Sequence, residues 1–210
     1  SSTRRLLIAD EVGLGKTIEA MYIWKELQAR EDARRLLIVC PSMLRHKWRD
    51  DLATRFGIAA EIVDAGQLKH KLEDLTERGI GNPFVCIASL EGLRPPAGYK
   101  DESKKGARID CARMMDHNPA RDDFALFDLA IIDEAHYMRN TGTAAQRLGH
   151  LLHDAARNLI LLTATPIQIN SENLYRLLQL VDPLQFEDFA VFGDVLAANA
   201  PVVRAQRALW

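Results

Sequence analysis

The sequence lacks the features of a membrane-spanning, secreted or broadly basic protein. None of its apolar runs approaches the roughly 18 residues of a membrane span, and no charged-then-apolar segment of the signal-peptide type opens the chain. Cationic residues are not in excess, because 27 lysines and arginines are set against 29 aspartates and glutamates, for a formal charge of −2. We therefore expect a cytoplasmic protein with no membrane partner. Any nucleic-acid surface on it must be local, since phosphate affinity comes from clustered Lys and Arg.

Cysteine is also scarce, and the three present are an odd number. Cys40 and Cys86 lie in or at the end of apolar runs, where a small buried thiol fits well. Neither the cysteines nor the histidines show the spacing of zinc ligands. These patterns predict reduced, buried cysteines and no structural zinc.

What the sequence does contain is a series of short, continuous apolar runs. With 210 residues and 48% apolar composition, the chain is long enough for one sizeable core. Unbroken rather than alternating apolarity is typical of strands that are covered on both faces. The runs lie at 5–9, 36–40, 59–63, 83–88, 128–132 and 158–162.

Helical patterns alternate with these runs. Leu44, Trp48, Leu52 and Phe56 place one apolar stripe at steps of four, which favours a core position for Trp48 over a base-stacking one. A helix is also predicted after residue 15 and another over 171–181, ended by the pair at 182–183. The order of elements predicts an α/β fold, a parallel sheet with helices on both faces.

Residues 95–123 interrupt this rhythm. The segment has three prolines, two glycines and little apolar periodicity before Phe124. Its six basic residues are offset by six acidic residues from Asp101 to Asp123. We interpret it as a solvated surface insertion, with a nucleic-acid clamp as the alternative.

A glycine-containing loop follows the first predicted strand. Gly13 and Gly15 allow the backbone to curl closely around phosphates, Lys16 can reach the β- and γ-phosphates, and the Thr17 hydroxyl can coordinate Mg²⁺. The usual pattern has glycine where this chain has Asp10, so a chance turn before a helix is the alternative. The predicted nucleotide-binding residues are Asp10, Val12, Gly13, Leu14, Gly15, Lys16 and Thr17.

Two adjacent carboxylates follow another strand, which we expect to neighbour the strand before the phosphate loop. Asp133 and Glu134 come after the apolar run at 128–132, and ligands of open α/β sheets bind at the carboxyl ends of the strands. Asp133 is suited to hold Mg²⁺, and Glu134 to orient and deprotonate an attacking water. A charge pair at a helix N-terminus is the alternative. Lys16, Asp133 and Glu134 are our candidate catalytic residues, with Thr17 and Asp133 as metal ligands.

Polar residues after the strand at 36–40 admit two interpretations. Ser42 can contact nucleic-acid phosphates or cap the following helix. Arg45 and Lys47 can contact phosphates too, or form a solvated face.

These motifs together resemble the Swi/Snf-type ATPases of helicase superfamily two. Residues 9–17 resemble their motif I, where an acidic residue replaces the first glycine, and Asp133-Glu134-Ala135-His136 resembles motif II. Residues 38–42 with Trp48 resemble motif Ia, 87–90 the next nucleic-acid-facing segment, and 162–168 motif III. The resemblance runs in order from residue 6 to about 192 and is closest to the bacterial RapA-like branch.

The resemblance implies a RecA-like P-loop NTPase fold that binds ATP and Mg²⁺. Residues 1–184 would be the first lobe, and 185–210 the start of a helical connector toward a second lobe, whose arginine finger is not in this sequence. One lobe alone should therefore turn over ATP poorly. The implied nucleic-acid contacts are Ser42, Arg45 and Ser89, and the residues implied to couple the two sites are His136, Thr163, Thr165 and Gln168.

The function that this resemblance implies is an ATP-driven translocase on double-stranded DNA. It would act on a protein complex on DNA, such as RNA polymerase, and DNA would stimulate its ATPase. A restriction-system translocase or an RNA helicase is the alternative among motors. A nucleotide-binding docking module without motor action is the alternative from another class.

Overall fold

The computed structural model describes residues 4–9, 15–79, 81–163, 171–183 and 185–194. Within these ranges six strands form one sheet, in the order β1-β6-β5-β2-β4-β3. Every pair of neighbouring strands is parallel. The strands are β1 (Arg4–Ala9), β2 (Arg35–Cys40), β3 (Glu61–Val63), β4 (Phe84–Ser89), β5 (Phe127–Ile132) and β6 (Ala156–Thr163).

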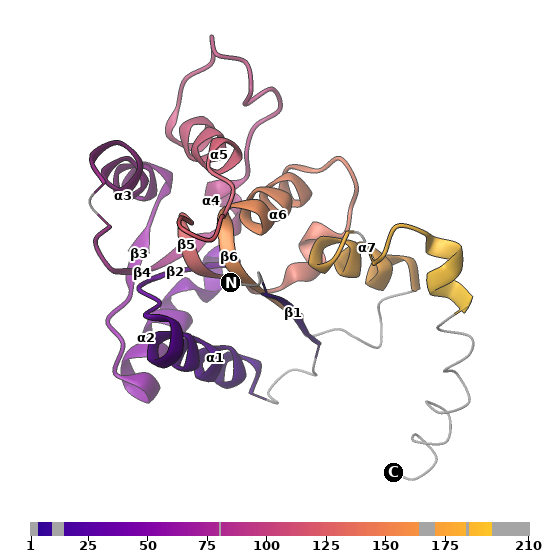
Figure 1. Cartoon of the computed structure of the whole chain (residues 1–210), viewed down its shortest axis with the longest axis horizontal. Helices are drawn as coiled ribbons and strands as arrows, with labels where there is room; N and C mark the ends of the chain where they lie inside the picture. Colours follow the sequence, from indigo (N-terminus) through magenta and orange to yellow (C-terminus); the bar gives the residue numbers. More distant parts are fainter. Residues whose placement is uncertain (1–3, 10–14, 80, 164–170, 184, 195–210) are drawn as a thin grey trace.

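Helices cover both faces of this sheet, as predicted (Figure 1). The alternation of side chains along β2 shows the two faces: Leu36, Ile38 and Cys40 join one apolar cluster, and Leu37 and Val39 join the other. Because both sets are buried, the strand reads as an unbroken apolar run.

One face is covered by α1 (Lys16–Glu31) and α2 (Arg45–Phe56) (Figure 1). Trp24 of α1 and Trp48 of α2 are both buried in the cluster on this face. The predicted core position of Trp48 is confirmed, since 3% of the residue is exposed. Gly57, with φ of 64°, ends α2 in the left-handed conformation that glycine adopts without steric cost.

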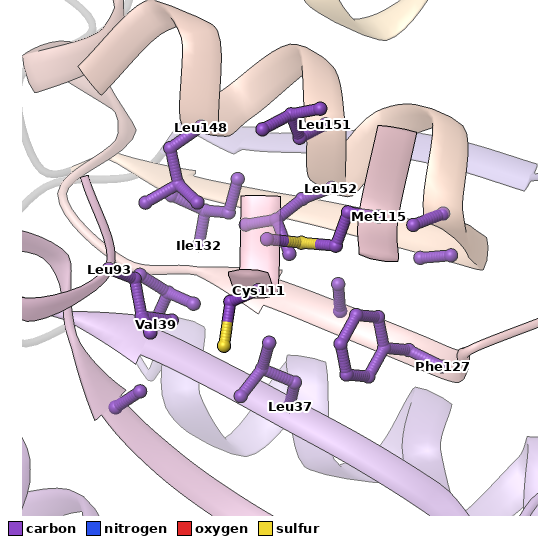
Figure 2. Close-up of a cluster of buried hydrophobic side chains, with 14 of the residues drawn as sticks. Leu37, Val39, Leu93, Cys111, Met115, Phe127, Ile132, Leu148, Leu151 and Leu152 are labelled. Atoms are coloured by element: carbon purple, nitrogen blue, oxygen red, sulfur yellow. The ribbon is translucent and has the colours of Figure 1, made fainter. Parts of the chain in front are cut away.

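The opposite face is covered by four longer helices that share the second cluster, shown in part in Figure 2. Figure 2 shows Leu148, Leu151 and Leu152 of one helix in the same cluster as Met115 and Phe127. These helices are α3 (Ala65–Arg78), α5 (Ala107–His117), α6 (Ala144–Ala155) and α7 (Ser171–Val181). The short segments at the sheet's carboxyl edge are η1 (Ser42–Leu44), α4 (Leu90–Leu93) and η2 (Ala135–Met138).

The segment 95–123 is not the solvated loop throughout that the sequence suggested. Its second half contains α5, which packs against α3 and α6 and buries Ile109, Cys111, Ala112 and Met115. The expectation was wrong here because small residues such as Cys111 and Ala112 give a weak apolar periodicity. Residues 101–106, most of which are charged, are exposed, as expected.

The strand that precedes the phosphate loop, β1, and the strand that delivers Asp133, β5, are not neighbours in the sheet, which corrects the expectation. β6 pairs with both β1 and β5, so it lies between the strand before the loop and the strand that delivers Asp133.

Cys40, Cys86 and Cys111 are free and buried, in agreement with the prediction for the first two. No helix in the described part of the chain has the length and apolar character to cross a membrane.

Candidate nucleotide and nucleic-acid sites

The described part of the phosphate loop is its last residue and the first turn of α1. Gly15 has φ of 95°, a left-handed conformation that suits glycine, and its carbonyl accepts from the backbone N–H of Ile18 at 2.7 Å. Lys16 and Thr17 then open α1, where the helix dipole and the first N–H groups favour an anion. Four predicted nucleotide-binding residues lie outside the described residues, namely Asp10, Val12, Gly13 and Leu14.

Asp133 is held at the end of β5 by three contacts. Its backbone N–H donates to the carbonyl of Val39 at 2.8 Å, which extends the pairing with β2 by one residue. Its Oδ1 accepts from the backbone N–H of Glu134 at 2.9 Å. Its Oδ2 accepts from the indole Nε1–H of Trp48 at 2.8 Å. The carboxylate is therefore fixed at the carboxyl edge of the sheet, where the sequence placed it.

Glu134 has an unusual backbone. Its φ of 53° and ψ of 47° place it in the left-handed region, which a non-glycine residue seldom adopts and which often marks a functional site. Its Oε2 lies 3.0 Å from Nδ1 of His136, and both atoms are buried without a hydrogen bond of good geometry to any residue that the structure describes. The His136 ring packs on Tyr137 with 4.4 Å between ring centroids.

The start of α1 and the acidic strand end line one small pocket. Thr17 and Asp133, the two predicted metal ligands, both line it. The remaining lining comes from α2 and the turn before it, namely Leu44, Lys47, Trp48 and Asp51. The structure thus brings together the two motifs that lie about 115 residues apart in the sequence.

Of the predicted coupling residues, His136 and Thr163 are described, and Thr165 and Gln168 are not. Thr163 ends β6 beside Ala9 of β1 and is fully buried. Its Oγ1 has no hydrogen-bond partner within the described ranges. Because η2, which contains His136, packs against β6, both residues belong to neighbouring elements at the same edge.

Ser42 is engaged by an acidic residue that the sequence reasoning did not consider. Its backbone N–H and its hydroxyl both donate to Oε2 of Glu91, at 3.1 and 2.6 Å. Burial raises the pKa of Glu91, but the hydrogen bonds from Ser42 and from the Glu91 backbone, together with the charge of Arg94, outweigh it, so the net pKa is lowered. The hydroxyl therefore faces Glu91 and does not cap a helix, while Arg45 donates from Nε to the Ser42 carbonyl at 3.2 Å.

The other two predicted nucleic-acid contacts line a second pocket at the carboxyl edge. Arg45 and Ser89 contribute to it, together with Arg108 from the first turn of α5. The Ser89 oxygen accepts from the backbone N–H of Gly92 at 2.9 Å, so it caps α4 and keeps its proton to donate. Arg108 is exposed and comes from the segment that we interpreted as an insertion, so this segment adds a positive charge at the edge.

Three residues of these sites were missed or only half predicted. The apolar stripe placed Trp48 in the core, but it gave no sign of where the indole N–H points. Glu91 pairs with Ser42 across 49 positions, and no local pattern signals such a contact. Arg108 could have been suspected, because it is one of the six basic residues of its segment.

The fold and the edge site together define an α/β, RecA-like class, in agreement with the prediction. The SNF2-related domain family matches residues 1–207, and the chain belongs to this family. A solved structure, the SWI2/SNF2 ATPase core of Sulfolobus solfataricus in complex with dsDNA, shares the fold with a TM-score of 0.60. That match has 16% sequence identity and covers 91% of this chain and 34% of that one.

Two curated relatives carry the name RNA polymerase-associated protein RapA. The relative from Photobacterium profundum is 34% identical over 208 residues, which is 96% of this chain and 19% of that protein. The relative from Stutzerimonas stutzeri is 32% identical over 212 residues, which is 98% of this chain and 20% of that protein. The predicted likeness to the RapA-like branch is confirmed. The chain spans about a fifth of the length of these relatives.

Proposed function

We propose that the chain is the ATP-binding lobe of an ATP-dependent, DNA-stimulated translocase. The observation that carries the proposal is the shared pocket of Thr17 and Asp133. It joins the start of α1, where phosphates are favoured, to a fixed carboxylate at the carboxyl edge of a parallel sheet, where ligands of α/β folds bind. Membership of the SNF2-related domain family supports the same assignment.

The residues present fit Mg²⁺ and a nucleoside triphosphate. Mg²⁺ prefers hard oxygen ligands, and the Thr17 hydroxyl and the Asp133 carboxylate line one pocket. Lys16, next to Thr17, would bind the β- and γ-phosphates. Bound Mg²⁺ would neutralise phosphate charge during phosphoryl transfer.

Glu134 would act as the base that orients and deprotonates the attacking water. Its left-handed backbone and the 3.0 Å approach of its Oε2 to Nδ1 of His136 restrict the direction of the carboxylate. His136 and Thr163, with Thr165 and Gln168, would couple this site to the nucleic-acid track.

Double-stranded DNA is the proposed track. Arg45 and Ser89 would contact its phosphates from the second pocket, and Ser42 would do so once Glu91 releases it. The solved relative with bound dsDNA supports DNA, and the RapA relatives support a DNA-bound complex that contains RNA polymerase as the target. Residues 185–210 would lead to a second RecA-like lobe that completes hydrolysis, so one lobe alone should turn over ATP slowly. The proposed location of the protein is the cytoplasm.

The test is calorimetric titration of Mg-ATPγS into four versions of the chain. Lys16→Ala should weaken binding at least a hundredfold, because it removes the phosphate-binding cation, while Glu134→Gln should bind as the wild type does. Lys25→Ala is the matched control, since it removes an exposed lysine from the same helix. Equal binding by Lys16→Ala and Lys25→Ala would refute the proposed phosphate site.

Turnover is then measured in the full-length gene product. Stimulation by duplex DNA without strand displacement would support a double-stranded DNA translocase. Stimulation by RNA with strand displacement would point instead to an RNA helicase. Nucleotide binding with no nucleic-acid stimulation would point to a docking module.

A further inference from the structure

The indole of Trp48 makes the only side-chain hydrogen bond to the Asp133 carboxylate among the residues that the structure describes. Nε1–H donates to Oδ2 at 2.8 Å, while the backbone N–H of Glu134 holds Oδ1 at 2.9 Å. Two donors on two different oxygens define both the rotamer and the plane of the carboxylate. The lone pairs that remain on each oxygen are free to face a ligand.

The indole itself cannot easily move. Trp48 is 3% exposed and belongs to the same apolar cluster as Leu52 and Ile38. A rigid ring in a packed core transmits its position to whatever its polar atom contacts, because packed interiors deform little.

The same helix carries a candidate nucleic-acid contact. Arg45 lies three positions before Trp48, which places the two side chains on neighbouring positions of one helix surface. Arg45 lines the second pocket and Trp48 lines the pocket of Thr17 and Asp133. One turn of α2 therefore lies between the two sites.

We propose that Trp48 is a positioning residue that orients Asp133 for its metal ion and links α2 to the nucleotide site. This inference rests on the proposed nucleotide-binding function. A hydrogen bond to a metal-binding carboxylate orients it, and loss of such a bond typically lowers metal affinity by about 10- to 100-fold. A shift of α2 on DNA binding would reach Asp133 through this bond, without passing through the residues of motif III.

The test compares Trp48→Phe with Trp24→Phe. Both tryptophans are buried in the same cluster, and the Trp24 Nε1 has no partner within the described residues. The two substitutions therefore remove the same atoms from the same core, and only Trp48→Phe removes the hydrogen bond to Asp133. ATPγS binding to each chain is titrated against Mg²⁺, and each unfolding free energy is measured with urea.

We expect Trp48→Phe to raise the Mg²⁺ concentration for half-maximal nucleotide binding about tenfold. Trp24→Phe should leave it unchanged, although it also removes buried indole atoms from the same core. An equal Mg²⁺ requirement in the two variants, with normal wild-type binding, would overturn this inference alone. Absence of Mg²⁺-dependent binding in all three proteins would overturn the proposed function and the inference with it.

A second readout needs neither nucleotide nor metal. In the ¹H–¹⁵N spectrum of the chain, Asp133→Ala should shift the Trp48 indole N–H signal and leave that of Trp24 in place. Asp51→Ala is the control, because it removes a carboxylate from the same pocket that does not bond the indole. An identical Trp48 shift in both variants would show that the indole senses pocket charge and does not bond Asp133, which contradicts the proposal.

The link to α2 is tested in the full-length gene product. Trp48→Phe should reduce the ratio of DNA-stimulated to basal ATP turnover at saturating Mg²⁺, and Trp24→Phe should not. An unchanged ratio in Trp48→Phe would overturn the link and restrict Trp48 to orientation of the metal ligand.

Discussion

An aspartate lies at each end of β5, and the two ends differ in how completely their polar groups are hydrogen-bonded. Asp128, near the amino end, accepts at Oδ2 from the backbone N–H groups of Arg34 and Arg35, each at 2.8 Å, and at Oδ1 from the Arg35 guanidinium at 3.1 Å. Its own backbone carbonyl accepts from Nδ2 of Asn158 at 2.9 Å. This end of the strand is a closed network in which every polar atom of the carboxylate is used.

The carboxyl end, five residues further on, is incompletely paired. The Asp133 carboxylate has two donors. At the same edge, Thr163 Oγ1 is buried with no hydrogen bond to any described residue, and Glu134 Oε2 and His136 Nδ1 lie 3.0 Å apart without a hydrogen bond of good geometry. An unpaired buried polar group costs stability, so the Thr163 hydroxyl needs an explanation. The comparison teaches that the aspartate at the amino end is fully paired within the protein, while the carboxyl end has polar atoms left over, as the proposed ligand-binding and coupling roles require.

The largest effect should come from Glu134→Gln. If this edge serves chemistry, the full-length gene product should lose about a thousandfold in DNA-stimulated ATP turnover, the typical share of a general base. Its unfolding free energy should stay within about 0.5 kcal/mol of the wild type, since the substitution conserves shape. Glu102→Gln, an exposed carboxylate far from the edge, is the control. A variant with normal turnover would remove Glu134 from the catalytic set.

Asp128→Asn is the corresponding substitution at the amino end of β5. It should lower the unfolding free energy by about 3 kcal/mol, because it leaves the buried Arg35 guanidinium without its counter-charge. Nucleotide binding by the folded variant should be unchanged. Urea unfolding measures the free energy of unfolding, and calorimetry measures nucleotide binding. Asp123→Asn, at an exposed position, is the control. A loss below about 0.5 kcal/mol would contradict the stabilising role of this network.

The loss of stability in acid should differ between the wild type and Asp128→Asn. Burial opposes the charged form of Asp128, yet the Arg35 guanidinium and the backbone N–H groups outweigh it, so the pKa is lowered from 3.8. A lowered folded-state pKa means that the contribution is present above about pH 5 and is lost as the pH falls through the folded value. The difference in unfolding free energy between wild type and Asp128→Asn should therefore shrink below pH 3.8. A constant difference from pH 6 to pH 3 would show that charge plays no part.

Thr163→Val should stabilise the protein, whereas Asp128→Asn should destabilise it. The hydroxyl is fully buried and unpaired within the described ranges, so its replacement by a methyl group should raise the unfolding free energy by about 1 kcal/mol. DNA stimulation of the full-length gene product should fall at the same time, because Thr163 is a proposed coupling residue. Thr76→Val is a suitable control, since that hydroxyl donates to the Leu72 carbonyl and its loss should destabilise. Destabilisation by Thr163→Val would show that the hydroxyl has a partner in the native protein.

The smallest effect concerns Glu91, the acidic residue that accepts hydrogen bonds from Ser42. Glu91→Gln removes a negative charge beside the proposed phosphate contacts and should tighten duplex DNA binding by the full-length gene product about threefold at low salt. Glu77→Gln, an exposed carboxylate on α3, controls for net charge. Fluorescence anisotropy measures both. Equal tightening would mean that only overall charge matters.

The strands were predictable from the sequence because burial on both faces leaves a direct trace, an unbroken apolar run. The run at 128–132 became β5 and the one at 158–162 lies within β6. The helix predicted over 171–181 matches α7 (Ser171–Val181). The helix α5 was not predicted, because its buried residues Cys111 and Ala112 are small and give only a weak apolar periodicity.

The site was predictable as a set of residue types and not as a set of contacts. Asp133 could be assigned to a strand end from sequence, but its bond to Trp48 spans 85 positions and depends on how α2 docks on the sheet. The left-handed backbone of Glu134 also has no local signature, since the residue is neither glycine nor asparagine. Tertiary packing imposes both features.

The buried thiols have a practical consequence. Burial raises the pKa of Cys40, Cys86 and Cys111 to about 12, so thiolate is nearly absent at neutral pH. Alkylating reagents should ignore all three, and a single cysteine introduced at Met43, which is 83% exposed, would be labelled selectively. The native chain is thus already a low-background host for a fluorophore or spin label at the carboxyl edge of its sheet.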